Sequence, residues 1–246
     1  KILEWLDAKG SAEVSELAPL LGTSEITVRR DLTTLAERGL LVRTHGGAMK
    51  LGLERNPVQF AKKTSSYADQ KARIAERAAG LIAEGDTIFL DCGSTVFRLC
   101  PLIRGKKLRV ITNSLPIVRE LMGSAVSINL IGGELDAARQ AVHGLVAEEH
   151  IARYRADAAF IGTDGFSLEA GLTARSELEA SHTRALIRQS ERVILLCDSS
   201  KLEHDQYVQF APPTAVHTLV TDAGADTEVL KRYRAAGLGV LVAGFS

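Results

Sequence analysis

Seven short apolar runs in the last two thirds of the chain constrain its fold more than any other feature. Each run is apolar at successive positions, so it should be buried on both faces, as the strands of a parallel sheet are. Helical segments separate the runs and can supply the crossovers that parallel strands need. The runs are TIFL (87–90), LRVIT (108–112), SINLI (127–131), AAFIG (158–162), RVILLC (192–197), TLVTD (218–222) and VLVAG (240–244). They predict an open, Rossmann-like α/β sheet with helices on both sides.

Glycine and small polar residues follow five of these runs, where each strand should end. Ligands of open α/β sheets bind outside the carboxyl ends of the strands. One such end would be weak evidence, because small residues are common there for steric reasons, but five favour a site for an anionic polyol. The segments are Asp91-Cys92-Gly93-Ser94-Thr95, Thr112-Asn113-Ser114, Gly132-Gly133, Thr163-Asp164-Gly165 and Asp198-Ser199-Ser200-Lys201.

The side chains at these strand ends suit a phosphorylated sugar or polyol. Ser94 and Thr95, at a helix start, would offer hydroxyls and free amides to a phosphate. Lys201 could complete the positive charge there, and Asn113 or Asp164 could bind sugar hydroxyls. The expected effector-binding residues are Asp91, Gly93, Ser94, Thr95, Asn113, Ser114, Gly133, Asp164 and Lys201.

A second feature, near the N-terminus, is the amphipathic segment from Ser24 to Arg38. Its serine can cap a helix, and Val28, Leu32 and Leu35 fall on one apolar stripe. Arg30 and Ile26 then point away from that stripe, flanked by threonines. Arginine can reach guanine edges or phosphate and an aliphatic group can touch a thymine methyl, so the outer face suits the major groove. Taken alone, such a segment is more often an ordinary amphipathic surface helix.

The neighbouring segments favour DNA binding. Val14–Leu21 reads as a short helix with Leu17, Leu20 and Leu21 inward, and a Gly22-Thr23 turn joins it to the next helix. Two short helices with a tight glycine-bearing connection form a helix-turn-helix. Residues 40–48 read as a strand, a glycine turn and a returning strand, which would make a wing. Its Arg43 and His45 would lie beside the phosphate backbone.

The charge of this region is polarised along the chain. Residues 1–28 carry two basic and five acidic side chains, and residues 29–50 carry five basic and two acidic ones. Such a distribution is expected if one face meets phosphates. The whole chain is neutral, with 30 basic and 30 acidic residues, so it carries no global signal for a polyanion or a membrane surface.

Composition predicts a cytoplasmic protein without a metal or cofactor. The chain has no apolar run of about 18 residues that could span a membrane, and its N-terminus does not resemble a signal peptide. Its three cysteines, Cys92, Cys100 and Cys197, are odd in number and lie in apolar contexts, as reduced thiols do. The histidines show no metal-ligand spacing with them.

Residues 23–48, TSEITVRRDLTTLAERGLLVRTHGGA, resemble the signature of the DeoR family of bacterial transcriptional regulators. The resemblance implies a winged helix-turn-helix that reads operator DNA. Ile26 lies where the family varies, so it is a candidate for operator choice. The matching positions are Ser24, Thr27, Arg29, Arg30, Asp31, Arg43, His45, Gly46 and Gly47. The expected DNA-binding residues are Ser24, Glu25, Ile26, Thr27, Arg29, Arg30, Thr33, Arg43 and His45.

The resemblance extends through LDCGST, ITNS, IGGEL, FIGTDG, GLT and DSSK to nearly the whole chain. It implies an effector domain that is itself similar to ribose-5-phosphate isomerase, whose fold is of the CoA transferase-like kind. By that likeness, Gly93, Ser94 and Thr95 would hold the phosphate of the effector, with Lys201 nearby.

The same likeness argues against catalysis. Isomerases carry Asp-Gly-Ala-Asp where this chain has Asp164-Gly165-Phe166-Ser167, so the second aspartate is replaced. The basic glutamate of the isomerases falls on Thr183, with Glu177 and Glu179 close in sequence. His143 is expected on a helix, packed or touching the effector. The chain is therefore expected not to be an enzyme, the alternatives being an isomerase-like enzyme fused to a DNA-binding domain and a winged domain used only for protein contacts.

The sequence predicts three parts: a DNA-binding domain (1–50), a linker (51–69) and an α/β domain (70–246) that binds effector and forms a dimer or tetramer. A long helix is expected from Gln70 to Ala83. The predicted function is a transcriptional regulator, a repressor of a sugar or polyol operon, whose partners are double-stranded operator DNA and a sugar phosphate. Two-fold symmetry of the oligomer would match repeated half-sites.

Overall fold

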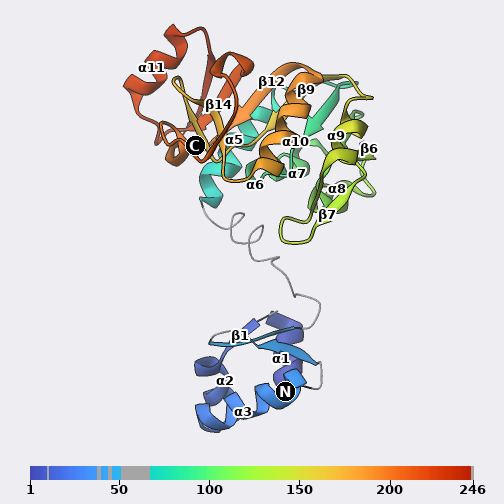
Figure 1. Cartoon of the computed structure of the whole chain (residues 1–246), viewed down its shortest axis with the longest axis vertical. Helices are drawn as coiled ribbons and strands as arrows, with labels where there is room; N and C mark the ends of the chain where they lie inside the picture. The colour runs from blue at the N-terminus through green and yellow to red at the C-terminus, as the bar shows by residue number, and fades with distance from the viewer. Residues whose placement is uncertain (10, 38–39, 44–45, 51–66, 245–246) are drawn as a thin grey trace. The chain divides into compact units, whose positions relative to one another are not determined.

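The computed structural model describes residues 1–9, 11–37, 40–43, 46–50 and 67–244 (Figure 1). It contains two compact units, Lys1–Val58 and Gln59–Ser246, called here the N-terminal and C-terminal units. Residues 51–66, most of the expected linker, fall outside the described residues.

The N-terminal unit is a helix-turn-helix completed by a small antiparallel sheet. The second helix begins at a capping box between Glu13 and Glu16 and ends at Gly22, whose left-handed conformation (φ 65°) turns the chain into the third helix. Strand β3 pairs with β2 and β1, in the order β1-β3-β2. The elements are α1 (Ile2–Lys9), β1 (Ser11–Glu13), α2 (Val14–Leu21), α3 (Glu25–Glu37), β2 (Leu41–Arg43) and β3 (Gly47–Lys50).

The core of this unit follows the predicted apolar stripe. Leu17, Val28 and Leu32 are fully buried together. The expectation for Leu20 was wrong, because its side chain is 45% exposed on the outer side of α2. Strand β1 was not predicted. It has only three residues and forms by pairing with the distant strand β3, so no hydrophobic periodicity in the sequence marks it.

The C-terminal unit is built on the predicted sheet. All seven apolar runs are strands of one parallel sheet, in the order β15-β14-β12-β9-β4-β5-β6. The strands are β4 (Thr87–Leu90), β5 (Arg109–Thr112), β6 (Ser127–Leu130), β9 (Ala156–Ile161), β12 (Ser190–Leu196), β14 (Thr218–Asp222) and β15 (Gly239–Ala243).

Alternate strand residues enter two separate cores, one on each face of the sheet. Ile88 and Leu90 pack with helices α5 to α8, whereas Phe89 packs with α9 to α11. This division confirms the prediction of an α/β sheet covered on both sides. The helices are α5 (Ala68–Ala79), α6 (Ser94–Phe97), α7 (Cys100–Ile103), α8 (Leu115–Leu121), α9 (Leu145–Ile151), α10 (Glu177–Arg188) and α11 (Thr227–Ala235), with two short 3-10 turns, η1 (Ser199–Lys201) and η2 (Pro213–Ala215).

Two small antiparallel sheets complete the unit and were not predicted. One has the order β10-β11-β13, and the other is the hairpin of β7 and β8. His143 ends β8 instead of lying on a helix, because Gly144 (φ 95°) breaks the chain before α9 begins at Leu145. The strands are β7 (Glu134–Asp136), β8 (Ala141–His143), β10 (Gly165–Ser167), β11 (Gly171–Ala174) and β13 (Val208–Ala211).

Within the described ranges, no helix has the length and apolar character needed to cross a membrane.

Candidate DNA-binding surface and effector pocket

Helix α3 presents a polar outer face around one exposed aliphatic side chain. The amide of Thr27 donates to Ser24 Oγ (3.3 Å), which anchors the start of the helix. Ile26 is 80% exposed, so its side chain is free to contact a partner of this helix face. The expected DNA-binding residues of this segment are all exposed: Ser24, Glu25, Ile26, Thr27, Arg29, Arg30 and Thr33.

The two arginines of α3 differ in their surroundings. Arg29 pairs with Glu25 one turn earlier (3.4 Å), whereas Arg30 makes no ion pair with any described residue. The hydroxyl of Thr33 donates to the carbonyl of Arg29 (2.9 Å), so its methyl group and remaining lone pairs face outward. Arg30 is therefore the arginine of this helix best placed to bind a base or phosphate.

Part of the wing lies outside the described residues. The backbone of Arg43 pairs with Ala48 between β2 and β3, as a wing requires. The side chain of Arg43 and the whole of His45 fall outside the description, so their expected phosphate contacts stay predictions.

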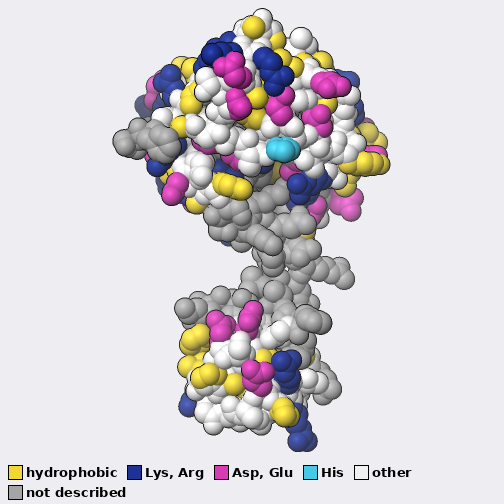
Figure 2. Space-filling model, turned by 90° about the vertical axis from the view of Figure 1, so that its left-hand side faces the viewer, with side chains coloured by type: hydrophobic (Ala, Val, Ile, Leu, Met, Phe, Trp, Pro, Cys, Tyr) yellow, Lys and Arg dark blue, Asp and Glu magenta, His cyan; other side chains and the backbone are white. Residues whose placement is uncertain are grey.

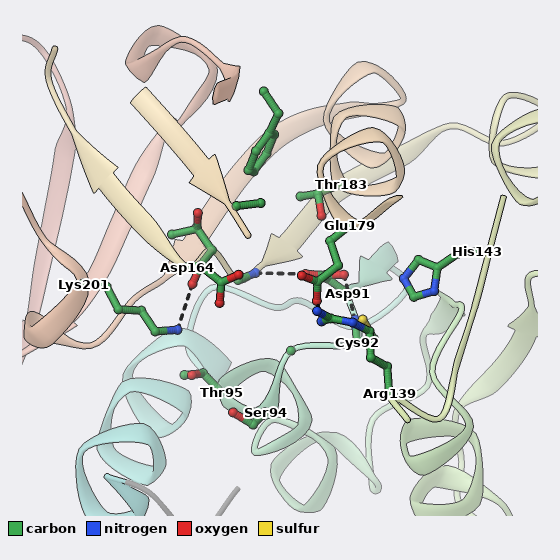
Figure 3. A pocket seen from close by; sticks show the side chains of 15 residues that line it. Asp91, Cys92, Ser94, Thr95, Arg139, His143, Asp164, Glu179, Thr183 and Lys201 are labelled. Atoms are coloured by element: carbon green, nitrogen blue, oxygen red, sulfur yellow. Dashed lines mark hydrogen bonds and ion pairs between the residues drawn. The ribbon is translucent and has the colours of Figure 1, made fainter. Parts of the chain in front are cut away.

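A pocket lies at the carboxyl ends of β4 and β9, where the sheet topology favours ligands (Figure 3). Loops after both strands, the β7–β8 hairpin, α10 and η1 surround it. Six expected effector residues line it: Asp91, Gly93, Ser94, Thr95, Asp164 and Lys201. The other lining residues are Cys92, Arg139, His143, Gly162, Thr163, Ala174, Glu179, Thr183 and Phe210.

Asp91 joins the two central strand ends beneath the pocket. Its carboxylate accepts hydrogen bonds from the amides of Cys92 (2.8 Å) and Gly162 (3.2 Å). Burial raises the pKa of Asp91, and these two amides oppose that rise. The carboxyl group thus holds the loops after β4 and β9 together and also faces the pocket.

One end of the pocket has the groups that a phosphate needs. In Figure 3 the side chains of Lys201, Thr95 and Ser94 gather at this end. The Lys201 ammonium donates to the carbonyl of Thr163 (2.8 Å) and lies 3.9 Å from Asp198, which holds it over the strand ends. The hydroxyls of Ser94 and Thr95 have no hydrogen-bond partner among the described residues.

The opposite end is lined by carboxylates, an arginine and a histidine. Arg139, from the turn between β7 and β8, forms an ion pair with Glu179 of α10 and lies 3.7 Å from Asp136. His143 lies at the same end (Figure 3). Burial lowers the pKa of His143, so its ring is held neutral although Asp91 favours its charge. Such groups can donate to and accept from hydroxyls.

Sequence reasoning did not place Arg139 and Glu179 in the pocket. They lie forty positions apart on elements whose packing brings them together, so no local motif marks them. Thr183, where the isomerases carry a glutamate, also lines the pocket, whereas Ser167 is buried in β10 and accepts a hydrogen bond from the amide of Ala170 (3.0 Å).

Three expected effector residues lie outside the pocket lining. Asn113 donates to the carbonyl of Val142 (2.9 Å), and Ser114 caps α8 by accepting from the amide of Ile117 (3.4 Å). Gly133 has φ 144°, and a Cβ there would lie 2.9 Å from the carbonyl of His143. Its small size therefore allows the loop to pack against β8.

A second, outer chamber adjoins the pocket and shares Ser94, Asp164 and Lys201 with it. Asp164 accepts a hydrogen bond from the amide of Arg175 (3.2 Å) at this boundary. The chamber is also lined by Tyr67 and Lys71, from the start of α5. The site is thus connected to the first helix of the C-terminal unit.

On the face of the C-terminal unit visible in Figure 2, basic and acidic side chains are intermingled.

Comparisons with known proteins agree with this architecture. A family model described as the DeoR-like helix-turn-helix domain matches residues 1–51, and one described as the DeoR C terminal sensor domain matches residues 66–223. The uncharacterized HTH-type transcriptional regulator FruR of Bacillus subtilis (strain 168) is 34% identical over 90% of this chain and 89% of its own length.

Two further relatives cover almost the whole chain. The HTH-type transcriptional regulator GlpR of Haloferax volcanii is 31% identical over 98% of this chain and 95% of its own. The putative aga operon transcriptional repressor of Escherichia coli O157:H7 is 30% identical over 99% of this chain and 92% of its own length. A ribose 5-phosphate isomerase of Methanocaldococcus jannaschii matches 56% of this chain and 55% of its own at 21% identity (TM-score 0.41), a likeness too partial to bear on function. The chain belongs to the DeoR family of helix-turn-helix transcriptional regulators.

Proposed function

We propose that this regulator represses a sugar or polyol operon and that a phosphorylated sugar, bound in the pocket at the ends of β4 and β9, controls its binding to operator DNA. The observation that carries the proposal is the division of the pocket into two chemically different ends. Lys201 and two free hydroxyls suit a phosphate, and Asp91, Glu179 and Arg139 suit the hydroxyls of a sugar. The names of relatives, including an aga operon repressor and a lactose phosphotransferase system repressor, support the same class of operon.

At the operator, α3 would lie in the major groove. Arg30 would bind a base or phosphate, Ile26 a thymine methyl, and Arg43 and His45 the backbone beside the wing. One such domain offers few phosphate contacts, so a homo-oligomer would engage repeated half-sites. Either a dimer or a tetramer would place two DNA-binding domains on repeated half-sites.

The outer chamber suggests how the pocket acts on DNA binding. Tyr67 and Lys71 line it; Tyr67 is one of the last residues of the expected linker (51–69), and Lys71 follows directly after it. An effector controls DNA binding only if it binds one arrangement of the protein better than another, and a differential of about 1–3 kcal/mol is typical. We infer that contacts at the start of α5 supply this difference.

The test is a thermal-shift screen of the intact protein with sugar phosphates and their unphosphorylated parents. The best ligand is then added to a complex with operator DNA, selected from a random library by the wild-type protein. We expect one phosphate, but not its parent, to raise the melting temperature and change operator affinity. Ser94→Ala and Lys201→Ala should abolish both effects, and Lys231→Ala, which removes an exposed lysine elsewhere, should not. No shift with any phosphate would refute the proposal.

A second candidate function, sugar-phosphate isomerisation, is favoured by the carboxylates of Asp91 and Glu179 in the pocket. Two observations argue against this function. Glu179 forms an ion pair with Arg139, and Ser167 is buried away from the pocket. A sensitive turnover assay on pentose and hexose phosphates separates the two functions. Turnover that Glu179→Gln abolishes would establish the enzyme.

A further inference from the structure

Buried polar atoms without partners are concentrated at one wall of the effector pocket. Five of the eight such atoms in the described part of the chain belong to Asn113, His143, Glu179 and His182, called here the inner polar wall. They are the Asn113 side-chain oxygen, His143 Nδ1, Glu179 Oε2 and both ring nitrogens of His182. The four residues come from the loop after β5, the end of β8 and helix α10.

The wall has two layers. His143 and Glu179 line the pocket, whereas Asn113 and His182 lie behind them and do not line it. The rings of His143 and His182 meet edge to face, with centroids 5.3 Å apart. Asn113 lies 3.5 Å from His143 Nε2, and its amide group also donates to the carbonyl of Val142. The rear layer therefore sets the orientation of the His143 ring.

The contact with Asn113 also assigns the hydrogen on that ring. The Asn113 amide nitrogen can only donate, and its bond to Val142 fixes which side-chain atom it is. Nε2 of His143 then accepts, so Nδ1 carries the hydrogen. A donor at His143 Nδ1 and an acceptor at Glu179 Oε2 are thus both buried without a partner.

Leaving a buried donor or acceptor unsatisfied costs about 1–3 kcal/mol, and native proteins satisfy the great majority of them. Two of the five atoms, His143 Nδ1 and Glu179 Oε2, belong to residues that line the pocket, and this indicates that a ligand supplies their partners. Hydroxyl groups fit, because each can both donate and accept. The dianionic phosphate group of a sugar phosphate does not, because its oxygens only accept hydrogen bonds and its charge repels the Glu179 carboxylate.

We propose that His143 and Glu179 bind hydroxyls of the effector at the end remote from its phosphate and so decide which sugar is recognised, with Asn113 and His182 as positioning residues for the His143 ring. The inference rests on the proposed function and adds specificity to it. A site built to bind a hydroxyl discriminates strongly against a ligand that lacks it, because its own buried groups are then left unpaired.

The experiment compares the preferred sugar phosphate with the epimer inverted at one hydroxyl remote from the phosphate, and with inorganic phosphate. Isothermal titration calorimetry of the full chain gives each dissociation constant. We expect the wild type to prefer one epimer at least tenfold. Glu179→Gln and His143→Gln should bring that ratio near one while the affinity for inorganic phosphate stays within about twofold. Glu169→Gln, the same change at an exposed glutamate, should alter neither.

A second measurement needs no variant to fold. In the wild-type protein with 15N-labelled histidine, the preferred epimer should shift the Nδ1 resonance of His143, and inorganic phosphate should not. Replacing His182 by Gln should reduce both that shift and the epimer ratio if the rear layer positions the ring.

The outcomes separate the two proposals. If sugar phosphates bind but the variants keep the full epimer ratio, or the His143 resonance does not move, the wall is satisfied by ordered water and only this inference fails. If neither sugar phosphates nor inorganic phosphate binds the wild type, the proposed function fails and this inference fails with it.

Discussion

At the scale of residues, individual side chains determine the surface that α3 offers to DNA and the groups that the pocket offers to an effector. On α3, Arg30 and Ile26 are exposed on the side opposite the buried stripe, so the helix offers one face for contact. His143 in the pocket wall and His182 behind it stay neutral because burial lowers the pKa of each ring. Both features can be tested by replacing one residue.

Arg30→Ala should weaken binding to the selected operator by ~1–3 kcal/mol, about 5- to 150-fold, if the guanidinium binds a base. Binding to unrelated DNA of the same length should change much less. Fluorescence anisotropy at one fixed salt concentration measures both affinities. Arg153→Ala, which removes the same charge from an exposed site in the C-terminal unit, is the control. An equal loss on both DNAs would assign Arg30 to a phosphate.

His182 should make the protein sensitive to acid. Burial lowers its pKa from 6.5 to about 3, so from pH 6.5 downward the unfolded chain binds a proton that the folded chain does not. Stability is therefore lost as the pH falls. Between pH 7 and pH 5 the wild type should lose about 2 kcal/mol more than His182→Leu. Urea unfolding at both pH values, followed by circular dichroism, measures the difference, and equal losses would contradict the assignment.

At the scale of elements, close backbone approaches decide how the small sheet of the N-terminal unit forms. Gly47 of β3 faces Glu13 of β1, and a Cβ at Gly47 would lie 2.0 Å from the carbonyl of Ala12. Pairing of β1 with β3 therefore requires glycine at this position.

Gly47→Ala should destabilise the N-terminal unit by at least ~1–3 kcal/mol, because the added methyl group forces β1 away from β3. Trp5 is the only tryptophan of the chain and packs against the core of this unit, so its fluorescence during urea unfolding reports on it. Gly46→Ala is the matched control, since a Cβ there meets nothing within 4 Å. Equal effects of the two changes would refute the steric explanation.

At the scale of the whole molecule, the question is how an effector in the C-terminal unit changes DNA binding by the N-terminal unit. The proposed coupling runs through Tyr67 and Lys71, which line the outer chamber. Tyr67 has a positive φ (53°) directly before α5, a conformation that is rare for a tyrosine. A change in this residue could follow occupancy of the chamber.

Tyr67→Ala should leave the affinity for the effector within a few fold and operator affinity without effector unchanged, but reduce the effect of the effector on operator binding. The proposal is supported if the coupling free energy between effector and operator binding, ~1–3 kcal/mol in the wild type, falls below about 0.5 kcal/mol in the variant. Tyr207→Ala, at an even more exposed tyrosine, should keep the full response. If Tyr67→Ala keeps it too, the coupling takes another route.

The sequence by itself determined the seven strands, the helix-turn-helix and the strand ends at which the pocket opens. These follow from local periodicity and from turn residues, which act over a few positions. Asp91 directly follows β4, Ser94 and Thr95 open α6, and Lys201 ends the short 3-10 turn after β12, so all four could be found in this way.

Only the tertiary structure decided the other end of the pocket. The ion pair of Arg139 with Glu179 and the contact of His143 with His182 join segments about forty residues apart, so they depend on how the β7–β8 hairpin packs against α10. Asn113 resembles its neighbours at the strand ends, yet packing turns its side chain to the carbonyl of Val142 behind the pocket. Periodicity records which face of an element is buried, but not which distant side chain meets it there.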